Sequence, residues 1–563
     1  MSVSQPLPIS FQHSRTPVRL LSGDYYGLDG RPVEVQVDVS PKGSPGFNIV
    51  GLPGKSTRES RERIRAAIRN AGFRFPHQDR ILVNLAPAFQ DKEDAVFDLP
   101  VALGILLATG QGLYPPNVAG GRTETHGTPD NGVAIDLSSL GFLGELGIEG
   151  ELWPVPGALI TATALRGKSA RRLVVPLANA DEVALLPDVE VFAARDIRDA
   201  LAAIAGKLDP HRRRLRSGSR GGGAAGLDQP AADFGEIRGQ EASKRALLVA
   251  AAGSHHAILC GPPGVGKTML ARRLGGVLPP LEFQESLEVT RIRSSAGLWL
   301  GGAGACGYGG TLAVGHGGAL AFERPFRAPH HTVSYSGLVG GGSPPRPGEI
   351  SLAHRGVLFL DELPEFPRKA LEALRQPLEE GSITIARSSG SVAFPAEFIL
   401  IAAFNPCPCG YLGHPRRPCH CTPFQVQAYR QRISGPLMDR FDLRVAVGPV
   451  EGADILAAGS GGARGLDSAA MRDHVAAAIR RQAARWGGGT ANGRVPLARL
   501  LSTGRVSGEA QRLLAQCSER RMLSVRSFER VLRVARTIAD LEESAGVERK
   551  HVEEALCYRE LPG

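Results

Sequence analysis

The sequence predicts an α/β fold in which a largely parallel sheet forms the centre of the chain, with an α+β region before it and a helical region after it. The first observation is that strand-like apolar runs alternate with helical periodicity from Phe234 to about residue 448, which is the pattern of an α/β domain. The second is that helical spacing alone follows residue 465, in the stretches Met471–Trp486, Gly508–Arg521, Ser527–Glu543 and Lys550–Glu560.

The N-terminal region, residues 18–205, alternates short apolar runs with amphipathic stretches. Val33–Val39 and Ile81–Leu85 have the pattern of strands, and Arg58–Ala71 has the spacing of a basic amphipathic helix. Leu99–Ala108 is the most apolar stretch, but it is far shorter than the roughly 20 residues that a membrane-spanning helix needs. We therefore expect a buried element there and no membrane partner.

Segments rich in glycine and polar residues divide the chain. Residues 114–134 and 459–465 have the composition of loops, and residues 206–232 combine five arginines with a Gly-Gly-Gly run, which indicates a flexible linker. The predicted organisation is an N-terminal domain at 1–205, a basic Gly-rich linker at 206–232, an α/β domain at 233–450 and a helical domain at 451–563.

The length and composition of the chain limit its class. A chain of 563 residues predicts three or four domains, and 42% hydrophobic with 22% charged residues is ordinary for a soluble protein. The net charge of +10 favours an anionic partner, but +4 of it comes from residues 209–220, where a solvated tether explains the arginines equally well. Eight cysteines and an N-terminus without a signal pattern favour a cytoplasmic location.

A phosphate-binding loop follows the predicted strand Ala257–Cys260 and precedes the helix that opens at Met269–Leu274. Its glycines allow backbone N–H groups to converge on phosphate oxygens at a helix N-terminus. The lysine supplies a positive charge to the β- and γ-phosphates, and the threonine hydroxyl is a Mg²⁺ ligand. The predicted nucleotide-binding residues are Gly261, Pro262, Pro263, Gly264, Val265, Gly266, Lys267, Thr268 and Met269.

A second motif, Val357–Leu360 followed by Asp361 and Glu362, is typical of a buried parallel strand that delivers two carboxylates to the ligand-binding edge of a sheet. We predict that Asp361 contributes to the coordination shell of Mg²⁺ and that Glu362 orients and deprotonates the attacking water. A strand that simply ends at the surface would show the same apolar run followed by two acidic residues. The position of this motif after a P-loop in the sequence favours the catalytic interpretation. Together the two motifs predict ATP hydrolysis.

Three further residues complete the predicted site. Asn405 ends the strand-like run Phe398–Phe404 and would be a polar sensor beside the γ-phosphate. Arg440 would reach the γ-phosphate of a neighbouring subunit as an arginine finger, and Arg526, at the start of a helix, would be a second sensor. A turn-forming asparagine and surface arginines are the alternative interpretations.

Four cysteines lie within 15 residues, in two closely spaced pairs at Cys407, Cys409, Cys419 and Cys421. Two such pairs are able to form a tetrahedral Zn²⁺ site, although Cys-x-Cys is a less usual spacing than Cys-x-x-Cys. Thiols in a tight loop are an equally good interpretation of the pattern. His414 and His420 are additional candidate ligands.

Taken together, these residues resemble the magnesium-chelatase-like YifB/ComM family of AAA+ ATPases. The resemblance extends over almost the whole chain, through the strings Gly46–Pro53, Glu59–Ala67, Val83–Ala88, Arg324–Thr332, Arg346–His354 and Asn405–Tyr411. It implies hexameric rings and a helicase-like activity on DNA that drives branch migration in natural transformation.

A hairpin pattern precedes the sensor strand, with Ile383–Ile385 and Val392–Phe394 around a tip at Arg387–Gly390. In one AAA+ branch a hairpin at this place projects into the central pore. Arg387 would then contact the backbone of a threaded DNA strand. The alternative interpretation is a solvated arginine.

The N-terminal region resembles the proteolytic domain of Lon, through Gly144–Val155 and Val174–Pro176. That domain needs a serine nucleophile activated by a lysine. This chain has Val96 and Leu159 at the corresponding places, and neither side chain can transfer an acyl group. We therefore predict a proteolytically inactive scaffold or DNA-contacting domain.

The sequence predicts an ATP- and Mg²⁺-dependent ring motor that moves along single-stranded or branched DNA. Two alternatives stay open at this stage. The likeness of the ATPase core to the chelatase I subunit favours a metal-insertion motor, and the Lon-like region favours an ATP-dependent protein remodeller.

Overall fold

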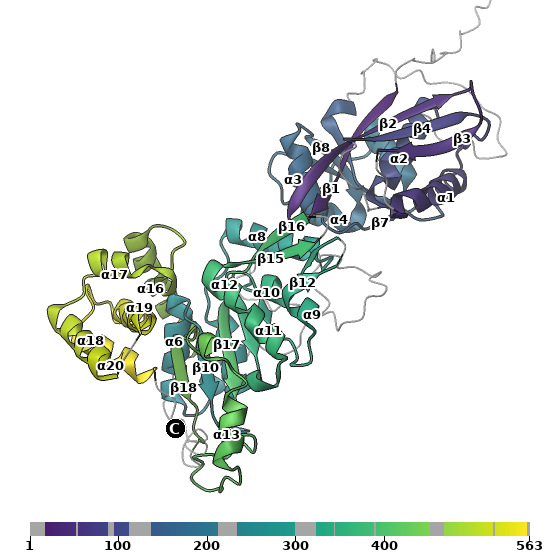
Figure 1. The fold of residues 1–563 in the computed structure, drawn as a ribbon. Helices are drawn as coiled ribbons and strands as arrows, with labels where there is room; N and C mark the ends of the chain where they lie inside the picture. Colours follow the sequence, from purple (N-terminus) through teal and green to yellow (C-terminus); the bar gives the residue numbers. More distant parts are fainter. Residues whose placement is uncertain are drawn as a thin grey trace, which may run out of the picture. The chain divides into compact units, whose positions relative to one another are not determined.

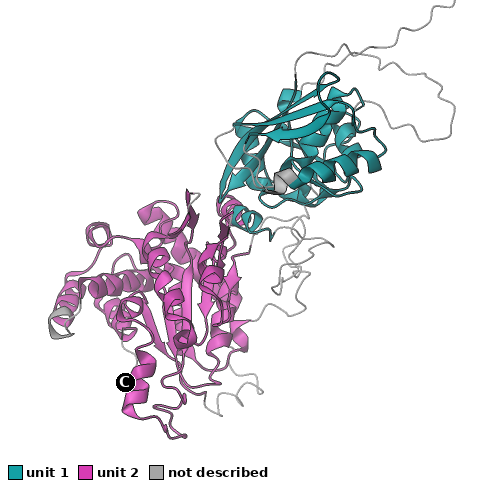
Figure 2. Ribbon diagram, turned by 45° about the vertical axis from the view of Figure 1, so that its right-hand side comes forward, with its two compact units in different colours: residues 1–226, 290–320 teal, residues 227–289, 321–563 magenta. Residues whose placement is uncertain are grey.

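The computed structural model describes residues 17–51, 55–87, 95–111, 137–211, 233–298, 323–342, 344–387, 390–450, 467–521 and 524–559. The predicted loops 114–134 and 459–465, and residues 212–232 of the predicted linker, lie outside the described residues. The chain divides into two compact units (Figure 2), unit 1 with residues 1–226 and 290–320, and unit 2 with residues 227–289 and 321–563.

Unit 1 is built on a seven-stranded sheet in the order β3-β4-β2-β1-β5-β8-β9. Figure 1 labels β1, β2, β3, β4 and β8 of this sheet. β1 and β2 pair antiparallel, as do β2 and β4, whereas the other neighbours pair parallel. The sheet strands are β1 (Val18–Tyr26), β2 (Asp29–Ser40), β3 (Gly46–Val50), β4 (Arg80–Ala86), β5 (Leu140–Phe142), β8 (Arg172–Pro176) and β9 (Glu190–Ala194). A short hairpin, β6 (Glu145–Leu146) with β7 (Leu152–Trp153), is separate from it.

The helices of unit 1 are α1 (Lys55–Asn70), α2 (Asp98–Ala108), α3 (Ala158–Gly167), α4 (Leu177–Val183) and α5 (Ile197–Ile204). The predicted strands and the basic helix of this region are confirmed. The apolar stretch Leu99–Ala108 is α2, whose side chains are almost all buried against β1 and β2. Across the described residues, no helix has both the length and the apolar character that a bilayer crossing requires.

Unit 2 contains a five-stranded sheet in the order β11-β14-β17-β10-β18, and all of its pairs are parallel. The predicted parallel sheet is therefore confirmed. Its strands are β10 (Ala257–Cys260), β11 (Phe326–Arg327), β14 (Val357–Leu360), β17 (Ile399–Phe404) and β18 (Leu443–Ala446). β10, β14 and β17 are buried throughout, which explains their uninterrupted apolar sequences.

The other elements of this part are helices and two short hairpins. The helices are α6 (Glu241–Gly253), α7 (Lys267–Arg273), α9 (Tyr335–Val339), α10 (Glu349–Leu352), α11 (Arg368–Ala373), α12 (Arg375–Glu380), α13 (Pro423–Arg430) and α14 (Gly435–Met438). The helix α8 (Phe283–Ser295) is divided between the units, and its residues from 290 onward belong to unit 1. The hairpins are β12 (Gly340–Gly341) with β13 (Arg346–Pro347), and β15 (Ser382–Arg387) with β16 (Gly390–Pro395).

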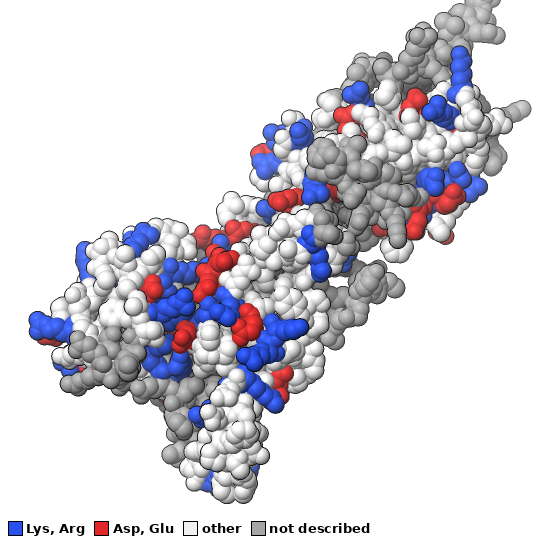
Figure 3. Space-filling model, viewed as in Figure 1, with Lys and Arg blue, Asp and Glu red and all other residues white. Residues whose placement is uncertain are grey.

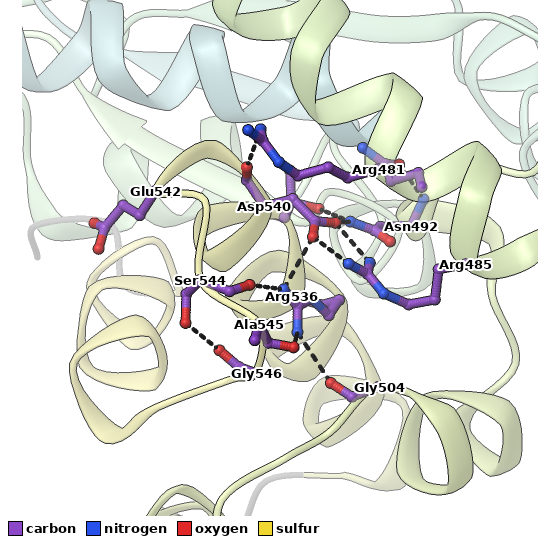
Figure 4. Close-up of polar contacts among 12 residues, drawn as sticks. Arg481, Arg485, Asn492, Gly504, Arg536, Asp540, Glu542, Ser544, Ala545 and Gly546 are labelled. Atoms are coloured by element: carbon purple, nitrogen blue, oxygen red, sulfur yellow. Dashed lines mark hydrogen bonds and ion pairs between the residues drawn. The ribbon is translucent and has the colours of Figure 1, made fainter.

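The C-terminal part is helical, as predicted, and α16 and α19 pack against α6. Its helices are α16 (Ser468–Trp486), α17 (Leu497–Thr503), α18 (Gly508–Arg521), α19 (Val525–Leu541) and α20 (Arg549–Cys557). Figure 4 shows the buried ion cluster that joins α16 to α19. Arg536 and Asp540, both fully buried, pair at 2.9 Å, and Arg485 holds the same carboxylate with two bonds of 2.6 and 2.8 Å.

Candidate active site

The loop after β10 has the backbone of a phosphate-binding loop. Gly264 and Gly266 have positive φ values of 83° and 91°, a region that side chains rarely adopt. A Cβ atom added to either glycine would meet no atom within 4 Å, so the space beside these two glycines is open. At Gly261 a Cβ atom would lie 2.2 Å from the Val447 carbonyl oxygen, so close packing with the chain beyond β18 requires a glycine there.

Lys267, the first residue of α7, is buried in this loop. Its Nζ donates to the carbonyl oxygens of Gly261 and Pro262, at 2.6 and 2.8 Å, and to Asn405 Oδ1 at 3.0 Å. Burial lowers the pKa of Lys267, whereas Asp361 acts in the opposite direction. The ammonium group is thus held between the P-loop and the end of β17 by three polar groups.

The carboxylates after β14 lie beside the same loop. Thr268 Oγ1 donates to Asp361 Oδ2 at 2.6 Å, which brings together the hydroxyl and the carboxylate that were predicted as Mg²⁺ ligands. Oxygen donors of this kind fit Mg²⁺, which is usually held by one or two protein groups together with substrate phosphates and water. The donor set and the open glycine loop therefore fit a Mg²⁺–nucleotide complex.

Glu362 follows with its backbone in the left-handed region, at φ 52°, which is uncommon for a residue with a side chain. Its side chain is 56% exposed, and its Oε2 lies 3.1 Å from His331 Nδ1. The ring of His331 packs in turn against His330 and Phe366. Glu362 is therefore accessible to a water molecule and is held by one imidazole.

Asn405 emerges from the end of β17, next to the P-loop strand β10 in the sheet. Besides its bond to Lys267, its backbone is hydrogen-bonded to the hydroxyl of Tyr429 on α13. Burial raises the pKa of Tyr429 to about 12, so this hydroxyl stays protonated at neutral pH. The predicted sensor is thus attached both to the nucleotide loop and to α13.

Arg440 does not join this group. It is 5% exposed and is bonded within the chain to Glu379 of α12 and to the Pro436 carbonyl. Burial lowers the pKa of Arg440, Glu379 raises it, and the guanidinium groups of Arg375, Arg526 and Arg530 lower it further. A buried arginine among other arginines is held at an electrostatic cost.

Arg526 is exposed in the first turn of α19, and its charge acts on Arg440. Two residues after Arg440, Asp442 accepts from His255 at 3.1 Å and from Arg530 of α19 at 3.1 Å. Although burial alone would raise the pKa of Asp442, these partners hold it well below its usual range. The segment that carries Arg440 is therefore fixed to the C-terminal helices.

The four predicted cysteine ligands come together in the loop between β17 and α13. The sulfur atoms of Cys407, Cys409, Cys419 and Cys421 all lie within 4.8 Å of one another. Backbone N–H groups of Tyr411 and His420 donate to the Cys409 sulfur and lower the pKa of that thiol to about 6. The ring of His414 packs against Tyr411, and its Nδ1 accepts from the backbone of Arg416 and Arg417.

The predicted hairpin is present as β15 and β16, paired from Ser382 with Pro395 to Arg387 with Gly390. Its tip residues 388 and 389 lie outside the described residues. Arg387 is exposed, and its guanidinium group lies beside Gly341 of β12. Figure 3 shows basic and acidic side chains interspersed on the visible face of unit 2, without a large patch of one sign.

Sequence analysis missed His331 as a contact of the predicted catalytic glutamate. The residue lies in the string Arg324–Thr332, one of those that carry the family resemblance. It follows β11, a strand of two residues that has no visible periodicity. The signal that was available is the position of a polar pair, His330 and His331, after a strand that neighbours β14.

These features define a P-loop ATPase of the AAA+-like class, and comparison with known proteins agrees. The magnesium chelatase subunit ChlI family matches residues 233–455, its C-terminal family matches residues 465–559, and a third ChlI family matches residues 33–119. The chain belongs to the magnesium-chelatase-like YifB/ComM family.

Two relatives that match almost the whole chain support this assignment, and a third matches part of it. The chain is 39% identical over 537 residues to the uncharacterized protein YifB of Salmonella typhimurium, with 95% of both chains covered. It is 38% identical over 541 residues to the competence protein ComM of Haemophilus influenzae, covering 95% of this chain and 96% of the relative. A magnesium-chelatase 67 kDa subunit of Heliobacterium mobile is 29% identical over 197 residues, which is 32% of this chain.

Proposed function

We propose that this protein is an ATP-dependent ring motor that acts on DNA, with a branch-migration activity like that of a helicase in recombination or natural transformation. The observation that carries the proposal is the convergence of Lys267, Thr268, Asp361, Glu362 and Asn405 at one end of a parallel sheet. The similarity to a competence protein over nearly the whole chain supports a role in DNA uptake or recombination.

The proposed hydrolysis follows from the positions of these side chains. Lys267 would exchange its bonds to Gly261 and Pro262 for phosphate oxygens, because these acceptors lie on the same loop. Thr268 and Asp361 would hold Mg²⁺, which neutralises charge on the phosphates when it is bound. Glu362 would take the proton of a water that attacks the γ-phosphorus while the bond to the ADP oxygen breaks, and Asn405 would hold that water or the phosphate in line.

The ring is proposed to be a homohexamer in which Arg440 reaches a neighbouring subunit and Arg526 acts within its own. Arg440 would have to leave Glu379 to do so. The electrostatic cost of its position among Arg375, Arg526 and Arg530 favours that exchange when a phosphate offers a stronger partner. Because Asp442 joins this segment to α19, movement of the C-terminal helices would be transmitted to Arg440.

We also propose a role for each domain. Residues 233–450 would be the ATPase domain and residues 451–563 its helical lid. Residues 1–205 would be a Lon-like domain without protease activity, since Val96 and Leu159 are buried apolar side chains. Residues 206–232 would link the two, and the whole protein is proposed to be cytoplasmic.

DNA is favoured over the other substrates by two observations. The match to a magnesium-chelatase subunit covers only 32% of this chain, whereas the match to a competence protein covers 95%. The Lon-like region is the feature that favours a protein remodeller, but the buried Val96 and Leu159 at its nucleophile and lysine positions give it no means of cleaving a peptide bond. Arg387, exposed on the β15–β16 hairpin, is the proposed contact with the DNA backbone.

A labelled four-way DNA junction tests the proposal. Purified protein is expected to convert the junction to duplex products with ATP, and Glu362→Gln is expected not to. Arg387→Ala should reduce conversion while ATP hydrolysis without DNA stays unchanged. If the wild type hydrolyses ATP but leaves junctions and forked duplexes intact, while it unfolds a model protein substrate, the DNA proposal is wrong.

A further inference from the structure

The cysteine cluster after β17 has the geometry of a metal site. The sulfur of Cys407 lies 3.4 Å from that of Cys409 and 3.6 Å from that of Cys419, and Cys409 and Cys419 are 3.5 Å apart. Zinc–sulfur bonds of about 2.3 Å in a tetrahedron place neighbouring sulfur atoms about 3.8 Å apart. The observed distances are close to that value and far longer than the roughly 2.05 Å of a disulfide.

The cluster lies in a partly buried loop rather than in an apolar core. Cys407 is fully buried, the other three are partly buried, and all four are free cysteines. The backbone N–H of Cys421 donates to the Cys419 sulfur at 3.4 Å. Such bonds orient and stabilise metal-bound thiolates. Without a cation, however, several thiolates within 4.8 Å of one another would repel strongly.

We propose that Cys407, Cys409, Cys419 and Cys421 bind one Zn²⁺ ion in a closed, tetrahedral S₄ site. Four protein ligands leave no open position, so the ion is structural and takes no part in hydrolysis. Four thiolate ligands favour zinc over Mg²⁺ and Ca²⁺, which require oxygen donors.

The site lies where a structural metal would hold the nucleotide pocket in place. Gly410, between the two cysteine pairs, packs on the P-loop, because a Cβ atom there would lie 2.7 Å from Pro263 Cδ. On the other side, Arg430 of α13 donates to the Pro406 carbonyl at 3.3 Å. The loop that carries the four cysteines, residues 407–421, thus lies between the sensor Asn405, the P-loop and α13. The ion fixes this loop, and through it the position of Asn405.

Metal content of the full-length protein tests the site itself, independently of any DNA activity. Protein purified without chelators is expected to carry about one zinc ion per chain, and Cys409→Ser with Cys421→Ser to carry far less. Cys517→Ser with Cys557→Ser is the matched control, because these two cysteines lie outside the cluster, and it should keep the zinc. Loss of zinc from this control, or equal zinc in both variants, would overturn the assignment.

A measurement on the wild type covers the case in which the cysteine variant does not fold. A mercurial reagent should release zinc in step with the loss of four protected thiols, and Co²⁺ in its place should give the intense visible bands of a tetrahedral thiolate complex. Four freely reactive thiols in metal-free protein, a pair of disulfides, or stoichiometric iron would contradict the zinc site.

The proposal that zinc fixes the position of Asn405 rests on the proposed ATPase function and is tested separately. Removal of zinc is expected to reduce kcat for ATP more than it raises KM, since Asn405 would act on the reacting phosphate. Asn405→Ala should make hydrolysis insensitive to zinc removal. If the protein carries stoichiometric zinc but its removal leaves kcat unchanged, zinc does not act on hydrolysis through Asn405, and the assignment of the metal site still holds.

Discussion

The two units of this protein both pack helices on a sheet, but they use polar residues differently. In unit 2, Lys267, Asp361 and Asn405 meet at the ends of parallel strands, and Glu362 beside them is half exposed. In unit 1, the fully buried Glu182 accepts from Asn179, which also bonds the Val155 backbone. Polar groups that meet at an open strand edge indicate chemistry, whereas buried and mutually bonded ones hold the fold together.

The largest expected difference comes from one substitution made in each unit. Glu362→Gln removes the proposed base and should lower kcat for ATP by a factor on the order of 10²–10⁴. Glu182→Gln keeps its hydrogen bond to Asn179 and should leave kcat unchanged. Steady-state phosphate release measures both, and a similar loss in the two variants would contradict the division of roles.

The C-terminal ion cluster should behave as structure although it lies in the ATPase unit. Asp540→Ala leaves the buried guanidinium groups of Arg536 and Arg485 without their carboxylate (Figure 4). Loss of one partner of a buried ion pair costs about 3–5 kcal/mol, so denaturant unfolding of unit 2 should shift by that amount. Glu543→Ala is the control, because Glu543 is largely exposed and the loss of its pair with Arg481 should cost little. Equal effects would show that the cluster is not the stabilising element.

The pH dependence of stability should have opposite signs in the two units. Burial raises the pKa of Glu182 to about 7, so its contribution is full below about pH 4.5 and is lost as the pH rises through 7. Burial lowers the pKa of His256 to about 4, so its contribution is full above pH 6.5 and is lost as the pH falls toward 4. Each effect is on the order of 3 kcal/mol between its limits.

Hydrogen exchange, corrected for the intrinsic effect of pH, measures the two units separately in the full chain. Peptides from α4 should be better protected at pH 5 than at pH 8, and peptides from α6 and β10 the reverse. Glu182→Gln should remove much of the dependence in α4 alone. A common pH dependence in both units would contradict the assignment of these two groups.

The smallest expected effect concerns His331, which holds Glu362. His331→Ala should lower kcat by about tenfold, the equivalent of one hydrogen bond to a charged group. His331→Asn keeps a nitrogen near the Nδ1 position and should retain most of the rate. His330→Asn is the control, because its Nδ1 bonds Thr332 instead. A rate for His331→Asn as low as that for His331→Ala would argue against the contact with Glu362.

The sequence alone predicts those features that depend on residues close together along the chain. The P-loop, the acidic pair after β14 and the helices beyond residue 467 were predicted because glycines, apolar runs and helical spacing are local signals. The pairing of Arg440 with Glu379 and of Asp442 with His255 and Arg530 was not predicted, since it joins residues from separate elements. For the same reason spacing left the metal question open at the four cysteines, and only the folded loop brings their sulfur atoms within 4.8 Å.

The rate of ATP hydrolysis with no DNA and with single-stranded, duplex or four-way DNA tests the central claim most directly. A DNA motor predicts a rate that rises several-fold with DNA, most with the structure on which it moves, and a rate in Glu362→Gln that stays far below that of the wild type under every condition. A wild-type rate that is the same with and without every DNA would contradict the claim and favour a chelatase-type or protein-remodelling motor.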